Sequence, residues 1–328
     1  MKVLVTGATG FVGSHAVKEL LAQGLEVRLL ARTPSKVPTV LGPLGVTVDD
    51  VVQGDMTDAD AVARALDGCD AVLHCAAEIG VSGGSAGLGS ANVDGARNVL
   101  GLAVEKGLDP VIWTSTVSAY IPTTDEVLTA DSPLAEPLSA YGAQKRDIEL
   151  LSRELAAAGA PVVSVVVGGV YGPVSPHLDS SFAAITGALA MGMVAPAAGM
   201  GIVDVRDLAQ ALVATLKPGQ GPKRHLMIGQ FVTWEQWAAE LQEAAGVPVP
   251  YTEVTVEQMV EMGRQFDELR AAGQDMPPLS EEAAVIMSAG RPGDDGPTLA
   301  ELGVSYRPVV ETFRDAVAWL RAEGHVIS

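Results

Sequence analysis

The chain begins Met1-Lys2-Val3-Leu4-Val5-Thr6-Gly7-Ala8-Thr9-Gly10-Phe11-Val12-Gly13. The apolar run over residues 2–5 is typical of a strand that is buried on both faces. A glycine-rich turn follows directly, and residues 14–23 then have apolar side chains at helical spacing, with Gly24 as the stop. A strand, a glycine turn and a helix in this order predict a binding site for the pyrophosphate of a dinucleotide.

Each glycine of the turn has a physical role in such a site. Gly7 lets the backbone turn sharply, Gly10 lacks the Cβ that would keep a pyrophosphate from the main chain, and Gly13 lets the helix pack close to the strand. The free N–H groups of the first helical turn then point at the anion. We expect the cofactor to contact Thr6, Gly7, Thr9, Gly10, Phe11, Val12 and Gly13.

Composition excludes several classes of function. The 328 residues, with 36 glycines and only 4% aromatic residues, suit one large or two modest domains in which helices pack closely on a sheet. The formal net charge of −19 argues against nucleic acid and anionic membrane as partners, because both would be repelled. No apolar run reaches membrane-spanning length, and no signal peptide is visible, so we expect a cytoplasmic protein. Cys69 and Cys75 have no histidine cluster at metal spacing, which predicts reduced cysteines and no metal site.

Apolar strands alternate with amphipathic helices through the first half of the chain. This alternation predicts an α/β fold with a Rossmann-type, doubly wound parallel sheet. Strands are expected at residues 25–31, 46–53, 71–75, from 111 onward and at 162–167, and helices at 58–66, 89–106 and 139–158.

After Gly172-Pro173 the pattern is less regular. We expect a dinucleotide-binding domain over residues 1–171, with returning segments near 200–232. A smaller, mostly helical substrate-binding domain is expected from residues 172–199 and 233–328. Helices are predicted at 180–192, 207–216, 234–245, 256–272 and 311–321, short strands at 202–205 and 226–228, a loop at 289–297, and a buried or lid helix within the apolar stretch 182–198.

Tyr141 and Lys145 lie four residues apart near the start of a predicted helix, so their side chains share one face. An ammonium group stabilises a nearby phenolate and lowers its pKa, which lets a tyrosine exchange a proton near neutral pH. Such a pair is common on ordinary helices, but this one follows the fifth strand of a sheet that began with the glycine turn. Hydroxyl groups end that fifth strand and could donate to a developing alkoxide.

Taken together, these motifs resemble the extended branch of the short-chain dehydrogenase/reductase superfamily, the NAD-dependent epimerase/dehydratase family. The resemblance implies that the third hydroxyl of the Thr114-Ser115-Thr116 run, Thr116, is catalytic together with Tyr141 and Lys145, with Ser115 and Ser118 as alternatives. Two later segments extend the resemblance over nearly the whole chain, namely residues 204–209 and 299–308.

The end of the second strand meets the adenosine ribose in this fold, where an acid binds the 2′-hydroxyl of NAD and an arginine accommodates the 2′-phosphate of NADP. Here Arg32 stands at that end without an acid, and Ser35 and Lys36 can add contacts. We therefore predict NADP(H) as the preferred cofactor over NAD(H). The alternative is that Arg32 is an ordinary solvated loop residue.

Further cofactor contacts are implied by the resemblance alone. They are Asp55 and Met56 beside the adenine, Ala76 and Ala77 after the fourth strand, Asn92 on the following helix, Gly169 and Val170 past the sixth strand, and the catalytic Tyr141 and Lys145. Ordinary loop or helix-flank chemistry is the alternative for Asp55, the two alanines and Asn92. The family often has Arg-Pro-Gly past the sixth strand, and this chain has Val167-Gly168-Gly169, so any contact of that arginine is absent.

Within the extended branch, the residues favour a reductase. Val117-Ser118 stand where sugar-nucleotide dehydratases usually carry an Asp-Glu pair, and Arg32 argues against the epimerases, which usually use NAD. What remains resembles the dihydroflavonol-reductase-like group, which implies NADPH-dependent reduction of a ketone or aldehyde on a small, fairly apolar substrate. Substrate contacts are expected from Thr116, Tyr141 and His177, although His177 could be a solvated loop residue.

Two other functions stay open at this stage. One is a nucleotide-sugar epimerase that keeps its cofactor bound, and the other is a non-catalytic NADP-binding redox sensor, which typically loses the tyrosine or the lysine. Members of the extended branch often form homodimers through the helices predicted here at 89–106 and 139–158, whereas several reductases of the group are monomers.

Overall fold

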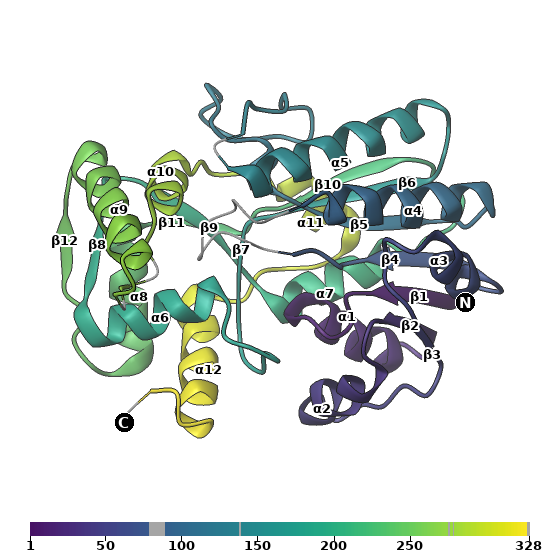
Figure 1. Ribbon diagram of the computed structural model, residues 1–328, viewed down its shortest axis with the longest axis horizontal. Coiled ribbons are helices and arrows are strands. Elements are labelled where there is room, and N and C mark those ends of the chain that lie inside the picture. Colours follow the sequence, from purple (N-terminus) through teal and green to yellow (C-terminus); the bar gives the residue numbers. More distant parts are fainter. Residues whose placement is uncertain (79–88, 138, 275, 278, 327–328) are drawn as a thin grey trace.

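The computed structural model describes residues 1–78, 89–137, 139–274, 276–277 and 279–326. A seven-stranded sheet, with every neighbouring pair parallel, forms the centre of the larger lobe (Figure 1). Its strands, in spatial order, are β10 (Lys223–Met227), β6 (Val162–Val167), β5 (Val111–Thr116), β4 (Ala71–His74), β1 (Lys2–Thr6), β2 (Glu26–Ala31) and β3 (Val51–Gln53). The predicted α/β fold with a Rossmann-type parallel sheet is confirmed.

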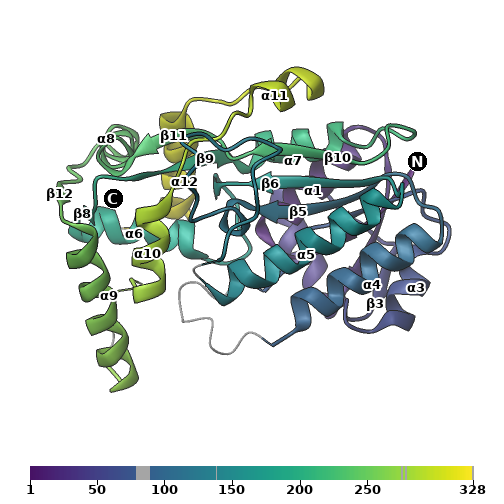
Figure 2. The ribbon, with the colours of Figure 1, turned by 90° about the horizontal axis from the view of Figure 1, so that it is seen from above.

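Helices cover both faces of this sheet because the strand residues alternate between the faces. Val3 and Val5 belong to the core under α1 (Phe11–Ala22), α2 (Val37–Leu41) and α7 (Val205–Ala214). Leu4, between them, belongs to the core under α3 (Ala59–Leu66), α4 (Ala91–Glu105) and α5 (Ala140–Ala157). Figure 2 shows α4 and α5 side by side along that second face.

A second lobe has its own core around a three-stranded sheet in the order β11-β9-β7 and a two-stranded sheet of β8 and β12. Tyr171, Trp237 and Phe313 meet edge-on in this core, with ring centroids 5.1 Å apart for Trp237 and Phe313. This core therefore contains several of the scarce aromatic residues of the chain. The elements are β7 (Gly169–Tyr171), α6 (Ser180–Met191), β8 (Met193–Ala195), β9 (Gly199–Asp204), β11 (Gln230–Thr233), α8 (Trp234–Ala245), β12 (Tyr251–Glu253), α9 (Val256–Ala271), α10 (Glu281–Ala289), α11 (Gly296–Leu302) and α12 (Val309–Ala322).

Several predicted boundaries are wrong for identifiable reasons. The third strand covers only residues 51–53 rather than 46–53. It lies at the sheet edge, and its pairing with β2 starts only at Asp50, whose carbonyl accepts from the N–H of Leu29. The apolar stretch 182–198 is helical only to Met191, since Gly192 has φ +82° and the next residues form β8. α1 begins at Phe11 instead of residue 14, because Gly10 is the N-cap. α10 and α11 were not predicted at all. Among the described residues, no helix has the length and apolar character needed to span a membrane.

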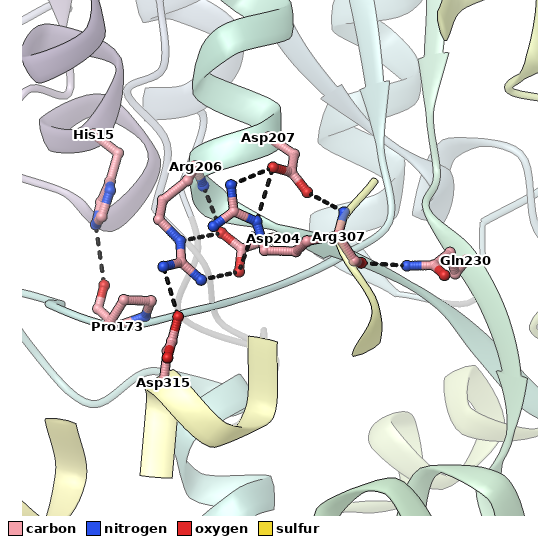
Figure 3. A network of polar contacts seen from close by, with 8 residues as sticks. All are labelled: His15, Pro173, Asp204, Arg206, Asp207, Gln230, Arg307 and Asp315. Carbon is pink, nitrogen blue, oxygen red and sulfur yellow. Dashed lines mark hydrogen bonds and ion pairs between the residues drawn. The ribbon is translucent and has the colours of Figure 1, made fainter. Parts of the chain in front are cut away.

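A network of charged side chains joins the two lobes (Figure 3). Asp204, at the end of β9, has a fully buried side chain that caps α7 and accepts hydrogen bonds from Arg206 at both carboxylate oxygens, at 2.9 and 2.8 Å. Arg206 also donates to Asp315 of α12, at 2.7 Å. Asp207 accepts two bonds from the guanidinium of Arg307, so the segment leading into α12 is held at the same point.

We expect Asp204→Asn to lower the free energy of unfolding by about 3 kcal/mol, because it removes the charge of a fully buried carboxylate that pairs with the partly buried guanidinium groups of Arg206 and Arg307. Burial, the largest single influence, raises the pKa of Asp204, but its bonds to Arg206 and the charges of Arg206 and Arg307 together outweigh burial and hold the pKa below its usual range. The contribution of Asp204 to stability is therefore complete above about pH 4 and is lost as the pH falls through its pKa in the folded state. Urea unfolding followed from pH 7 to pH 3 measures both effects.

Asp315→Asn is the control, because this carboxylate is 37% exposed and its ion pair is worth no more than about 1 kcal/mol. Equal losses of stability in the two variants would show that the buried position of Asp204 is unimportant.

Candidate active site

The glycine turn is packed closely against its neighbours. At Gly7, with φ +77°, an added Cβ would lie 2.5 Å from the backbone nitrogen of Ala76. At Gly13 it would lie 2.2 Å from the carbonyl oxygen of Gly7. At Gly10 the nearest atom is the Gly7 oxygen, at 3.2 Å. Thus the fold itself requires glycine at positions 7 and 13, whereas at position 10 the surrounding protein leaves more room.

The N-terminus of α1 is suited to an anion. Gly10 is the N-cap, and among the described residues no side chain caps the helix and no acidic residue lies in its first turn. The N–H groups and positive dipole end are therefore available to a pyrophosphate. The side chain of Thr6 is not available to it, because its hydroxyl lies 2.6 Å from Nδ1 of His74 inside the core. Phe11 is also buried, against His15 and Phe182.

Arg32, at the end of β2, lies beside two carboxylates. Its side chain is 69% exposed, with Nη1 3.3 Å from Oε1 of Glu78 and Nε 3.9 Å from Oδ2 of Asp55. Ser35 and Lys36 are exposed in the short 3-10 helix that follows. The contact between Glu78 and Arg32 was not predicted from the sequence. The signal that could have indicated it is the position of Glu78 directly after the small-residue turn Ala76-Ala77, at the same edge of the sheet as Arg32.

Asp55 and Met56 are held by their own surroundings. The Oδ1 atom of Asp55 accepts from the N–H and hydroxyl of Thr57, and the backbone bond is the first cause of a pKa below the usual range for Asp55. Met56 packs on Gly95 of α4, where an added Cβ would lie 2.5 Å from its Cγ. The adenine contact expected for these residues therefore stays a prediction.

Asn92 is 1% exposed and contacts protein groups at both ends of its amide. Its Oδ1 accepts from the N–H of Glu78 at 2.8 Å, and its Nδ2 donates to the Glu78 carbonyl and to Gln144. The side chain therefore fixes the turn after β4 and joins α4 to α5.

The candidate catalytic pair, Tyr141 and Lys145, lies in the first two turns of α5. Ser139 caps this helix by accepting from the N–H of Gly142, which places Tyr141 in the first turn and Lys145 one turn later. The Nζ atom of Lys145 donates to the carbonyl of Thr114 at 2.9 Å and lies 5.9 Å from the centre of the Tyr141 ring. Thr116, at the end of β5, hydrogen-bonds the Tyr141 hydroxyl.

Of the three candidate hydroxyls, the structure brings Thr116 to Tyr141. Ser118 instead hydrogen-bonds Thr116. Its backbone N–H donates to the hydroxyl oxygen of Thr116, and its own hydroxyl oxygen accepts from the Thr116 hydroxyl. The hydroxyl of Ser115 is buried without a hydrogen-bond partner among the described residues. His177 is exposed on the loop before α6, and no contact among the described residues joins it to Tyr141.

Burial controls the charges around this pair. Burial lowers the pKa of Lys145 to about 8, with Cys75 and Glu149 acting in the opposite direction. Burial raises the pKa of the Cys75 thiol to about 12, while burial and the charge of Lys145 lower that of His74 to about 3. Both neighbours are therefore neutral near pH 7.

Lowering of the Tyr141 pKa toward neutral by Lys145 stays a prediction. Burial raises that pKa, and the bond from Thr116 offsets burial only in part. The phenolate is thus costly to form unless a positive charge lies close to it.

Gly168, which stands where the family often has proline, lies in a closely packed segment past β6. A Cβ at Gly168 would lie 2.0 Å from the carbonyl oxygen of Ile228, and one at Gly169 would lie 2.1 Å from Cε of Met200. A side chain at Gly168 would therefore overlap the backbone after β10, whereas the atom nearest to Gly169 is the end of the flexible Met200 side chain. No group of metal-ligating side chains occurs among the described residues.

Comparison with known proteins places these features in context. A model of the NAD dependent epimerase/dehydratase family matches residues 3–229. A putative dihydroflavonol 4-reductase of Synechocystis sp. is 27% identical over 98% of this chain and 95% of the relative. Cinnamoyl-CoA reductase 1 of Oryza sativa subsp. japonica is 31% identical over 69% of this chain and 71% of the relative. The structure of DesIV, a dTDP-glucose 4,6-dehydratase from Streptomyces venezuelae with NAD and TYD bound, has a TM-score of 0.75 at 25% identity, covering 99% of each chain.

Two glycine variants separate ligand binding from folding. We expect Gly10→Ala to weaken dinucleotide binding roughly tenfold, which is about 1.4 kcal/mol. Its free energy of unfolding should fall by no more than about 1 kcal/mol, because the backbone at Gly10 is extended and the nearest protein atom is 3.2 Å away.

Gly13→Ala should instead lower the free energy of unfolding by about 2 kcal/mol, since the added methyl group overlaps the Gly7 carbonyl. Urea unfolding and a fluorescence titration with NADPH measure the two effects. Wild-type dinucleotide affinity in Gly10→Ala would refute the assignment of this turn to the pyrophosphate.

Proposed function

The chain belongs to the NAD dependent epimerase/dehydratase family, and from this premise we propose that it is an NADPH-dependent reductase of ketones or aldehydes on small, fairly apolar substrates. The observation that carries the proposal is that Thr116, Tyr141 and Lys145 lie together, at the end of β5 and the start of α5. A proton donor, a second hydroxyl and a nearby ammonium are what the reduction of a carbonyl group requires.

The protein's own residues handle the proton. When bound, the cofactor supplies the hydride. Tyr141 donates its proton to the carbonyl oxygen of the substrate, and the hydroxyl of Thr116, which lies beside that of Tyr141, donates to the same oxygen. Lys145, held by the Thr114 carbonyl, provides the positive charge that offsets the cost of a buried phenolate.

Two kinds of support favour an apolar substrate. The relatives include a putative dihydroflavonol reductase and a cinnamoyl-CoA reductase. The second lobe has an apolar core in which Phe182 of α6 is buried, while Met191 at the end of α6 is 66% exposed. We therefore retain residues 172–199 and 233–328 as the proposed substrate-binding domain, with His177 as its proposed contact. A homodimer through α4 and α5 also stays a prediction, in keeping with the exposed Leu150 on α5.

Tyr141→Phe is expected to lower the rate of NADPH oxidation at least ~100-fold, because it removes the proton donor. NADPH affinity should stay within about threefold of wild type, since that ring is retained. The measurement is absorbance at saturating NADPH against a panel of aromatic and aliphatic ketones and aldehydes. Tyr251→Phe is the matched control, because Tyr251 belongs to β12 in the other lobe.

Either of two results would contradict a reductase. Tight NADPH binding without turnover of any carbonyl compound would favour a redox sensor. Purified protein that retains oxidised cofactor and does not consume added NADPH would favour an epimerase.

The preference for NADPH rests on Arg32. The 2′-phosphate has to compete with Glu78 and Asp55 for the guanidinium, so both carboxylates weaken the preference. We expect Arg32→Ala to raise the Kd for NADPH about tenfold, and Glu78→Gln to lower it about threefold, with little effect on NADH.

Arg97→Gln is the control, since Arg97 is an equally exposed arginine that pairs with Asp94 on α4. Fluorescence titration with both cofactors gives the four Kd values for each variant. Equal affinity of the wild-type protein for NADH and NADPH would refute this role of Arg32.

A further inference from the structure

A third polar side chain follows Tyr141 and Lys145 along α5. Glu149 lies one helical turn beyond Lys145, so these three side chains share a face of the helix. Its side chain is 0% exposed. Oε1 accepts from the Ser164 hydroxyl of β6 at 2.6 Å, whereas Oε2 has no hydrogen-bond partner among the described residues. A buried, incompletely bonded carboxylate is costly, so its charge calls for a compensating interaction.

Two guanidinium groups lie near the carboxylate of Glu149. The Nε atom of Arg224 on β10 lies 3.9 Å from Oε2, and that of Arg153 on α5 lies 4.0 Å from it. Neither makes a direct hydrogen bond to Glu149, and Arg224 is anchored by its bond to the carbonyl of Ala130. Tyr120 also faces this carboxylate, but burial and Glu149 raise the pKa of Tyr120 to about 12, so it stays neutral.

The same carboxylate acts on Lys145. The groups that face the ammonium are Tyr141 on α5, the Thr114 carbonyl on β5, and His74 and Cys75 at the end of β4. His74, Cys75 and Tyr141 are all neutral near pH 7 for the reasons given above. Among the described residues, Glu149 is therefore the carboxylate whose charge favours the ammonium form of Lys145.

We propose that Glu149 is a positioning residue that keeps Lys145 charged beside Tyr141 and thereby sets the upper pH limit of the reaction. The part concerning the reaction rests on the proposed function, while the part concerning the charge of Lys145 does not. The charge of Glu149 acts on Lys145 across the buried space between α5 and the sheet. The dielectric constant is low there, so a single charge acts more strongly than in water.

Glu149→Gln tests the proposal because it retains the shape of the side chain and an acceptor for Ser164 but removes the charge. The pKa of Lys145 is measured without cofactor or substrate, from the pH dependence of its acetylation by trace acetic anhydride, read by mass spectrometry. We expect this pKa to fall by about one unit from its value near 8. The decline of kcat at high pH should move down by the same amount, with kcat at pH 6 within about twofold of wild type.

Three further variants keep the test decisive. Glu149→Asp should restore part of the shift, because the charge returns on a shorter side chain. Ser164→Ala removes the hydrogen bond but not the charge, so it should leave the pKa of Lys145 unchanged even if the protein is less stable. Glu154→Gln changes an exposed acid of the same helix and should have no effect.

The proposal is overturned if Lys145 has the same pKa in folded Glu149→Gln as in the wild type, or if Ser164→Ala shifts that pKa as much as Glu149→Gln does. A shifted pKa of Lys145 in a protein that reduces no carbonyl compound would support the electrostatic role of Glu149 and count against the proposed reaction alone.

Discussion

The close contact between the glycine turn and its neighbours is the constraint on which the rest of the structure depends. The turn after β1 is pressed against the backbone after β4 at Gly7, and α1 is pressed against the turn at Gly13. A side chain at either position would separate β1, β4 and α1, which together form the centre of the sheet and one of its covers. The same approach leaves an uncapped helix N-terminus directed at the edge of the sheet where the other site residues lie.

α1 also connects the nucleotide site to the second lobe. Phe11, in its first turn, packs on Phe182 of α6 with ring centroids 5.3 Å apart. His15, one turn later, has its Nε2 3.1 Å from the carbonyls of Pro173 and Val174, in the segment that enters that lobe (Figure 3). Together with the buried carboxylate of Asp204, these contacts fix the two lobes relative to each other. The position of α6 is therefore coupled to the helix that would hold the pyrophosphate.

The candidate catalytic pair, Tyr141 and Lys145, lies in an interior whose polar groups are mostly uncharged. Burial keeps His74 and Cys75 neutral and makes a phenolate at Tyr141 unfavourable. Under these conditions a single ammonium group has a large influence, and so does any carboxylate that acts on it. The chemistry of the site is thus set less by the Tyr-x-x-x-Lys spacing itself than by the dry environment into which the fold places it.

Much of this protein could be predicted from local sequence patterns, because strand and helix periodicity, glycine turns and the spacing of Tyr141 and Lys145 are properties of neighbouring residues. These patterns identified the α/β fold, the alternation of strands and helices in the first half of the chain, and the family. The lengths of edge elements, such as the third strand, depend on partners that local patterns do not specify. The neighbours of Arg32 and Lys145 could not be predicted either. Glu78, which pairs with Arg32, follows another strand, and His74 and Cys75, which lie near Lys145, are neutral because they are buried. The sequence by itself therefore determined the main elements of the first half of the chain and the motif residues. Only the tertiary structure decided which charges meet and which are removed from water, because both depend on contacts between segments far apart in the chain.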